Sequence, residues 1–216
     1  VIGCAIAAIL LLTLAYMIPR DLFVKHIEES ENLLYALCDD NNINANIDGY
    51  VYDTKTNIIT LEEVIAPIEG VQIANYNCPG QIVISGKTEA VAEAGEKLKE
   101  AGAKRVLPLK VSGPFHSKML VGAGEKLGKV LDTVEIHTPE IPYIANVTAD
   151  YVTDAADVKP LLMKQVSSSV RWEQTIRKML ADGVDTFIEI GPGKTLTGFM
   201  RKIDKNAKAF NIEKLE

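Results

Sequence analysis

The spacing of apolar residues beyond position 71 predicts strands that alternate with helices. Residues 88–102 place Ala90, Val91, Ala94 and Leu98 on one face of a helix, and Gly102 stands where that helix would end. Short apolar runs between turn residues predict strands, and longer stretches with helical periodicity predict the remaining helices. We expect strands at 71–77, 82–86, 104–111 and 184–190, a strand and a turn at 141–152, and further helices at 117–134, 170–183 and 194–203. This order is typical of an α/β protein.

Two of the expected strands carry more detail. Pro108 lies inside 104–111, and because proline cannot donate a ladder hydrogen bond, this strand should lie at an edge. The run VDTFIEI at 184–190 predicts a buried strand, which a Gly-Pro-Gly turn follows.

The first 70 residues give weaker signals. Residues 1–19 carry no charge, and a buried strand followed by a helix is favoured over a membrane-spanning segment, which needs about 20 apolar residues. One or two helices are expected at 21–40 and an Asn-rich loop at 41–49. A hairpin is expected at 50–64, with an insertion of no fixed role as the alternative.

The composition is that of an ordinary globular protein. The chain has 216 residues, of which 47% are hydrophobic and 24% charged. A net charge of −6 argues against a nucleic-acid partner, which favours a strongly basic surface. Three widely spaced cysteines form no CxxC pair, so we expect no metal site and a reducing, cytoplasmic location.

Three positions are candidates for chemistry on the residues alone. His116 lies in VSGPFHSKML, at a strand-to-helix junction, where it could be a general base or a surface histidine. GPGKT at 191–195 lacks the first glycine of a phosphate-binding loop and is better explained as a tight turn than as an anion site. Cys78 is better explained as structural than as a nucleophile. The chain contains no Gly-X-Ser-X-Gly segment that would hold a nucleophilic serine.

Four stretches resemble one protein family. They are IANYNCPGQIVISG, AGAKRVLPLKVSGPFHS, PYIANVTAD and FIEIGPGKTLTG, and they occur in the family's order within 71–204. On these motifs the chain resembles the malonyl-CoA:acyl carrier protein transacylases of fatty acid synthesis. The resemblance implies an α/β fold with part of an α/β-hydrolase-like acyltransferase core, at 111–216, and a ferredoxin-like small subdomain, at 71–110. Residues 1–70 stay an unassigned amino-terminal region.

The resemblance also implies roles for single residues. In the family a serine attacks malonyl-CoA, and the malonyl group then moves to the phosphopantetheine thiol of acyl carrier protein. His116 would take the serine proton, and the main-chain carbonyl of Gln165 would orient it. Phe115 would favour malonyl over a branched acyl group, and Asn75 and Asn77 would contact substrate. We expect no cofactor, because malonyl-CoA is a substrate and the partner carries the phosphopantetheine.

A basic surface is expected to receive the acidic carrier protein. We assign it to Lys118, Lys194 and Arg201. Lys194, Arg201, Lys205 and Lys208 would share one helix face if the last helix ran that far, although a solvated face is an equal alternative.

Two functions remain open at this stage. GCAIAAIL at 3–10 resembles the strand that opens the family's small subdomain, so we expect the matched sequence to begin after the family's serine and its malonyl-binding arginine. The chain would then be a truncated or split acyltransferase that carries the base and exposes an apolar sheet face. The alternative is a non-catalytic remnant of the fold, tethered to a membrane through residues 1–18, that binds acyl carrier protein or CoA.

Overall fold

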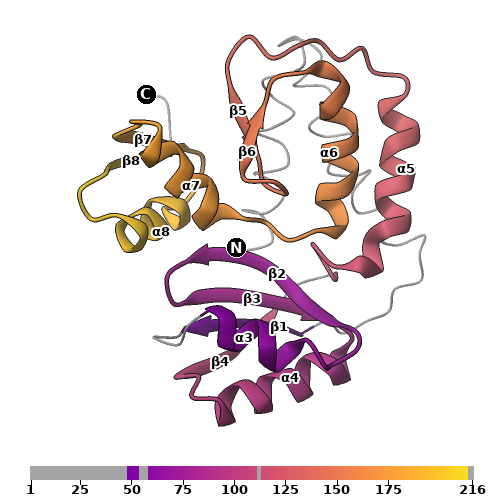
Figure 1. Cartoon of the computed structure of the whole chain (residues 1–216), viewed down its shortest axis with the longest axis vertical. Coiled ribbons are helices and arrows are strands. Elements are labelled where there is room, and N and C mark those ends of the chain that lie inside the picture. The colour runs from indigo at the N-terminus through magenta and orange to yellow at the C-terminus, as the bar shows by residue number, and fades with distance from the viewer. Residues whose placement is uncertain (1–47, 54–57, 111–112, 214–216) are drawn as a thin grey trace.

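The computed structural model describes residues 48–53, 58–110 and 113–213. Within this part of the chain the elements form three groups, each with its own sheet (Figure 1). None of the described helices is both long and apolar enough to cross a membrane. The apolar run at 1–18, and with it the proposed tether, lies outside the described residues.

The lower group in Figure 1 is an antiparallel sheet with two helices. The sheet has the strand order β2-β3-β1-β4, and each neighbouring pair is antiparallel. Ile73 and Ile84 of the sheet share one core with Leu61 of α3 and Val91 of α4, so both helices cover the same face. The elements are β1 (Asp48–Asp53), α3 (Ile58–Ile65), β2 (Val71–Cys78), β3 (Gln81–Gly86), α4 (Thr88–Glu100) and β4 (Arg105–Lys110).

Helix α4 and strand β4 agree with the sequence prediction. Ala90, Val91, Ala94 and Leu98 are all buried, as the helical spacing requires. Gly102, just beyond the helix, has a φ of +99°, a left-handed conformation that glycine adopts without strain. Strand β4, which contains Pro108, lies at the edge of the sheet.

The hairpin expected at 50–64 is wrong. Strand β1 ends at Asp53, and the chain resumes at Ile58 as a helix instead of a second strand. Leu61 and Ile65 are buried while Glu63 between them is exposed, which fits one face of a helix, because in a strand all three would share a face. Strand β1 and helix α3 join β2–β4 in one group, although both come before residue 71.

The upper right group in Figure 1 pairs two helices with a short hairpin. Its elements are η1 (Lys118–Leu120), α5 (Val121–Leu131), β5 (Tyr143–Ala145), β6 (Asp150–Val152) and α6 (Ala155–Ser167). Asp154 caps α6 by accepting a hydrogen bond from the main-chain N–H of Ala156 at 2.8 Å. The sequence analysis made no prediction for α6, which contains Pro160, a residue that normally argues against a helix interior.

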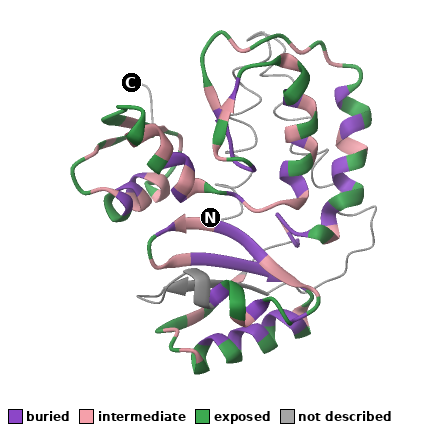
Figure 2. Ribbon diagram, viewed as in Figure 1, coloured by how far each residue is buried: buried purple, intermediate pink, exposed green. Residues whose placement is uncertain are grey.

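The upper left group contains α7 (Trp172–Ala181), β7 (Thr186–Ile190), α8 (Thr195–Ile203) and β8 (Lys208–Ile212). Strands β7 and β8 form a two-stranded parallel sheet. Strand β7 exists as expected, but its predicted burial is wrong: Ile188 and Ile190 are 56% and 61% exposed. Helices α7 and α8 pack with Phe187 and Ala209 on the opposite face and leave this face uncovered, as the exposed colouring of β7 and β8 in Figure 2 shows.

The segment between α6 and α7 joins the groups at the open edge of β2. The main-chain N–H of Val170 donates to the oxygen of Ala74 at 2.8 Å, and the N–H of Tyr76 donates to the oxygen of Val170 at 2.9 Å. These bonds form a parallel bridge between Asn75 and Val170. The end of α6 is therefore held beside β2, where the candidate site lies.

Candidate active site

His116 occupies a tight turn that hydrogen bonds between neighbouring residues stabilise. The N–H of Phe115 donates to the oxygen of Gly113 at 2.9 Å, and the hydroxyl of Ser117 donates to the oxygen of Pro114 at 2.7 Å. His116 itself has a φ of +59°, in the left-handed region that non-glycine residues seldom adopt. Such a conformation costs of order 1–3 kcal/mol and persists only where the surroundings impose it.

The ring of His116 is oriented by the end of helix α6. Its Nδ1 lies 3.0 Å from the main-chain oxygen of Gln165. A carbonyl can only accept, so Nδ1 carries the proton and Nε2 of the neutral ring has the lone pair. The carbonyl of Gln165 is available because the last four carbonyls of a helix have no partner inside it. Two residues 49 positions apart in sequence are thereby brought together, as the resemblance implied.

The other ring nitrogen of His116 has no hydrogen-bond partner within the described ranges. Nε2 of His116 is buried and makes no hydrogen bond to any described residue. Burial lowers the pKa of His116 below its ordinary value, and the nearby main-chain carbonyls of Gln165 and Ser168 oppose that shift in part. The ring is therefore neutral near pH 7 and offers an unpaired nitrogen, which is the state a general base requires.

Gln72 is a contact of this turn that the sequence analysis missed. Its Nε2 donates to the main-chain oxygen of His116 at 2.9 Å, and its Oε1 accepts from the N–H of Lys118 at 2.9 Å. One side chain of β2 thus binds the main chain on both sides of Ser117. No sequence signal marks Gln72, because its role depends on the turn that folds against it.

The close packing of helices α5 and α6 also stabilises the arrangement of His116 and Gln165. A Cβ at Gly124 would lie 2.7 Å from the main-chain oxygen of Met163, and one at Gly128 would lie 2.6 Å from the Met163 Cε. Glycine at both positions lets the two helices approach closely. Because α5 follows the His116 turn and α6 carries Gln165, this close packing helps set the distance between base and carbonyl.

The expected substrate residues lie around the same junction. Phe115 is half-buried and packs with Leu120, Ala123 and Val166. Asn75 is 5% exposed and lies at the bridge to Val170, while Asn77 is half-buried further along β2. Phe115 is thus next to the base in the chain, and the two asparagines follow Gln72 on its strand.

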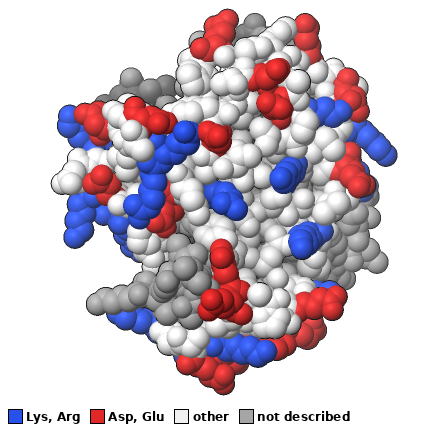
Figure 3. Space-filling view, viewed as in Figure 1, with Lys and Arg blue, Asp and Glu red and all other residues white. Residues whose placement is uncertain are grey.

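The expected docking residues are divided between two groups of the fold. Lys118 is exposed in η1, whereas Lys194 and Arg201 are exposed near the two ends of α8. Lys194, Arg201, Lys205 and Lys208 do not share one helix face, because α8 ends at Ile203 and Lys208 lies in β8. The Nζ of Lys208 is 3.6 Å from the Oδ2 of Asp185. Figure 3 shows basic and acidic groups intermixed on the viewed face of the C-terminal group.

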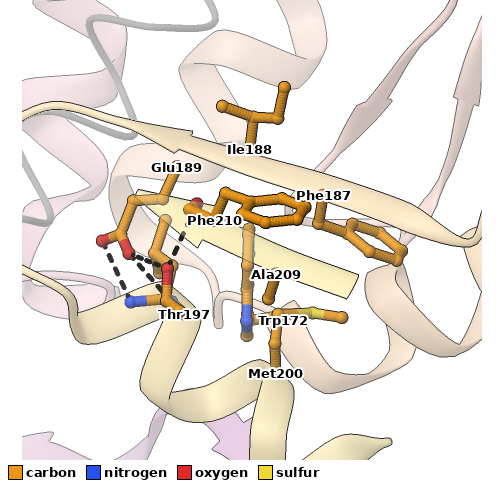
Figure 4. Close-up of a pocket in the computed structure, with 9 residues that line it drawn as sticks. Trp172, Phe187, Ile188, Glu189, Thr197, Met200, Ala209 and Phe210 are labelled. Atoms are coloured by element: carbon orange, nitrogen blue, oxygen red, sulfur yellow. Dashed lines mark hydrogen bonds between the residues drawn. The ribbon is translucent and has the colours of Figure 1, made fainter. Parts of the chain in front are cut away.

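The GPGKT turn is not an open anion site. The carboxylate of Glu189 accepts hydrogen bonds from the N–H of Leu196 at 3.1 Å and the N–H of Thr197 at 2.8 Å (Figure 4). It also accepts from the Thr197 hydroxyl at 2.7 Å. These amides open α8 and would otherwise be the anion donors, so Glu189 already fills the role of a bound anion. A cavity of about 60 Å³ beside it is lined largely by apolar side chains.

Cys78 is buried at the end of β2. It is 1% exposed and belongs to the core cluster that contains Ile176 and Met200. This environment fits the structural role that the sequence analysis favoured over nucleophilic chemistry.

Residues 53–214 match the family described as "Acyl transferase domain". The chain belongs to this family. The malonyl CoA-acyl carrier protein transacylase of Bacillus subtilis is 52% identical over 142 residues, which are 66% of this chain and 45% of the relative. The transacylase of the same name from Haemophilus influenzae is 41% identical over 144 residues, which are 67% of this chain and 46% of the relative.

Solved structures agree with the sequence relatives. An acyl carrier protein S-malonyltransferase from Vibrio cholerae superposes with a TM-score of 0.85 at 34% identity, covering 93% of this chain and 65% of that one. A malonyl-transacylase in complex with its type II PKS acyl-carrier protein has a TM-score of 0.83 at 31% identity, covering 93% of this chain and 64% of that one. These comparisons favour the acyltransferase hypothesis over the non-catalytic remnant.

The match covers only part of each relative. The chain spans about half the length of the curated relatives it matches. It is an acyl transferase family member of mixed helices and strands, and its sequence contains no Gly-X-Ser-X-Gly segment.

Proposed function

We propose that this chain carries the base of a site that transfers a malonyl group from malonyl-CoA to the phosphopantetheine thiol of acyl carrier protein, in fatty acid synthesis. The observation that carries the proposal is that His116 is buried, with Nδ1 bound to the Gln165 carbonyl and Nε2 without a hydrogen-bond partner among the residues that the structure describes. A hydroxyl is a weak nucleophile and needs such a base beside it. The serine would come from the remainder of the acyl transferase domain.

The reaction would use His116 twice in each half. Nε2 takes the serine proton while the serine oxygen attacks the thioester carbonyl of malonyl-CoA, and the imidazolium then protonates the departing CoA thiolate. In the second half Nε2 takes the proton of the phosphopantetheine thiol, whose sulfur attacks the malonyl-serine ester, and the proton returns to the serine oxygen. The partial negative charge at the end of α6 would stabilise each imidazolium. No cofactor is consumed in either half.

The finer features of the site belong to the same proposal. Gln165 would fix the tautomer of His116 through its carbonyl, without a buried charged partner. Phe115 would limit the room beside the acyl group, and Asn75 and Asn77 would contact substrate. The β-α-β-β-α-β order of the lower group and its strand order β2-β3-β1-β4 support a ferredoxin-like subdomain. The parallel pair β7 and β8 with its helices supports part of an α/β-hydrolase-like core.

The partner residues remain proposals too. Lys118 is the best placed of the docking candidates, because it lies two residues beyond the base and is exposed. Lys194 and Arg201 would form a second contact from α8. The cytoplasmic location stays a prediction.

The test is malonyl transfer in a restored chain. The restored chain is one polypeptide in which the part of the Bacillus subtilis relative ahead of the matched residues precedes the full chain. It should move label from malonyl-CoA to acyl carrier protein, and His116→Ala should slow transfer by about 10²–10⁴-fold. His137→Ala is the matched control, because His137 is 69% exposed.

Two results would contradict the proposal. One is a restored chain that folds but transfers no malonyl group. The other is a His116→Ala variant as fast as the His137→Ala control. The full chain alone, which has no Gly-X-Ser-X-Gly segment, is the negative control and should take no label from malonyl-CoA.

A further inference from the structure

Arg171 is an exposed arginine at the junction between the groups, and it forms no ion pair with a carboxylate of the described residues. It directly precedes α7 and follows Val170, which forms the parallel bridge with Asn75 of β2. Its main-chain N–H donates to the oxygen of Asn146 at 2.9 Å. The main chain of Arg171 is therefore held beside Asn75, one of the two asparagines expected to contact substrate.

The side chain of Arg171 lies over an aromatic ring that is itself held in place. The guanidinium carbon is 6.0 Å from the centre of the Tyr76 ring, within the range of a cation–π contact. The Tyr76 hydroxyl donates to Oε1 of Glu62 at 2.7 Å, which ties the ring to helix α3. Burial and the hydrogen bond to Glu62 raise the pKa of Tyr76, so the phenol stays neutral and does not neutralise the charge of Arg171.

Two carboxylates of this region are already bound elsewhere. Glu62 accepts from Tyr76, and Glu173, two residues beyond Arg171, accepts from Nε and Nη2 of Arg177 at 2.8 and 2.6 Å. Arg171 is thus a positioned guanidinium without an anionic partner in the described part of the chain. The planar fork of N–H donors on a guanidinium matches the geometry of phosphate oxygens.

We propose that Arg171 binds the phosphate at the end of a pantetheine arm. The proposal rests on the proposed function, in which malonyl-CoA and acyl carrier protein both carry such an arm, with the reacting sulfur at one end and a phosphate at the other. The phosphate must therefore bind away from the base. Arg171 meets this condition, because residues 168–171 carry it up to about 13 Å beyond the end of α6, at about 3.3 Å for each extended residue.

The test compares ligands with and without the phosphate. CoA and pantetheine are titrated separately into the restored chain, and binding is followed by NMR, which requires no transfer. Arg171→Gln should weaken CoA binding about 10- to 100-fold, because a charge-assisted hydrogen bond is lost, and should leave pantetheine binding unchanged. Arg171→Lys keeps the charge without the fork and should give an intermediate affinity. Lys202→Gln, at an exposed position of α8, is the control and should bind CoA like the wild type.

A second experiment tests acyl carrier protein as the source of the phosphate. Starting from the malonyl-enzyme of the restored chain, Arg171→Gln should slow transfer to acyl carrier protein about 10- to 100-fold at low salt. Transfer to free pantetheine, which has the thiol and no phosphate, should not change.

Three outcomes would overturn the proposal. Equal weakening of CoA and pantetheine binding by Arg171→Gln would show a structural role, and unchanged CoA binding would show that Arg171 does not contact the CoA phosphate. Slower transfer to acyl carrier protein with unchanged CoA binding would identify a contact with acidic side chains of the carrier protein. CoA binding that depends on Arg171 in a restored chain that transfers no malonyl group would support the phosphate site and contradict the proposed function.

Discussion

The side-chain amide of Gln72 donates a hydrogen bond of 2.9 Å to the main-chain oxygen of His116. The same amide accepts from the N–H of Lys118, so β2 holds the turn that carries the base from both sides. Gln72 contacts only main-chain atoms of this turn in these two bonds. Its effect on catalysis would therefore act through the position of His116.

Replacing Gln72 should loosen the turn. Gln72→Ala removes both hydrogen bonds and should lower the free energy of unfolding by about 1–3 kcal/mol, at 0.5–1.5 kcal/mol for each bond. Gln72→Glu keeps an acceptor for Lys118 and loses the donor to His116, so it separates the two bonds. In the restored chain both variants should lower kcat and leave KM for malonyl-CoA unchanged. Equal kcat and an unchanged pH profile for all three proteins would show that Gln72 does not position the base.

Burial of His116 should make stability depend on pH. Its pKa is lowered in the folded chain, so the unfolded chain binds the proton more readily. Stability should be constant above the unfolded pKa of about 6.5 and should fall as the pH drops below it, toward the lower folded pKa. Urea unfolding between pH 5 and 8 would measure this.

Two variants test the assignment of that pH dependence. His116→Gln should flatten the curve below pH 6.5, because it removes the buried titrating ring. His137→Gln, at an exposed position, should keep the wild-type slope. A slope that survives in His116→Gln would assign the effect to another group.

Glycine at position 124 should be required for the His116–Gln165 hydrogen bond. A Cβ there would lie 2.7 Å from the main-chain oxygen of Met163, and a main-chain atom cannot turn aside as a side chain can. Gly124→Ala should force α5 from α6 and cost about 1–3 kcal/mol of unfolding free energy. The Nδ1–H proton signal of His116 should shift or exchange faster in an NMR spectrum.

Gly122→Ala is the matched control for that change. It lies on the same helix, and a Cβ there would meet nothing within 4 Å. Alanine has the higher helix propensity, so this variant should be as stable as the wild type or more so. Equal destabilisation by both substitutions would rule out the steric explanation.

A charge reversal at Lys118 should weaken the encounter with acyl carrier protein. A rim charge acts mainly on the association rate and its salt dependence. In the restored chain Lys118→Glu should slow transfer to acyl carrier protein at low salt and converge with the wild type at high salt. Hydrolysis of the malonyl-enzyme should not change. Lys104→Glu, an exposed lysine in the lower group, is the control, and an equal effect there would exclude a local docking contact.

Local periodicity predicted some elements and missed others, such as α3 and α6, although these also pack within their own groups. The spacing of Ala90, Val91, Ala94 and Leu98 located α4 because the face that they form packs on the neighbouring sheet. The burial of β7 was overestimated. Its apolar residues predict a strand that other elements cover, but the strand's own sequence does not show whether those elements are present. Helix α6 was missed, although Val158 and Leu162 are buried at helical spacing on either side of Pro160.

The site was predictable only through its resemblance to a family. His116 alone was an ambiguous histidine, and nothing in the spacing of the chain connects it to Gln165, whose contribution is a main-chain atom. Gln72 and Glu189 gave no signal, since each acts on main-chain groups that only the folded chain brings near. Hydrogen bonds to the main chain leave little trace in the identity of the residues that receive them.

The left-handed turn at His116 has a consequence for protein engineering. The position combines a strained φ of +59° with a buried nitrogen that has no hydrogen-bond partner in the described part of the chain, and each feature lowers stability by of order 1–3 kcal/mol. Glycine or asparagine would adopt this φ at lower cost. A redesign that selects substitutions for thermal stability alone would therefore favour replacing His116 early. Variants designed for stability should therefore keep His116, because the most strained residue of the turn is also the proposed general base.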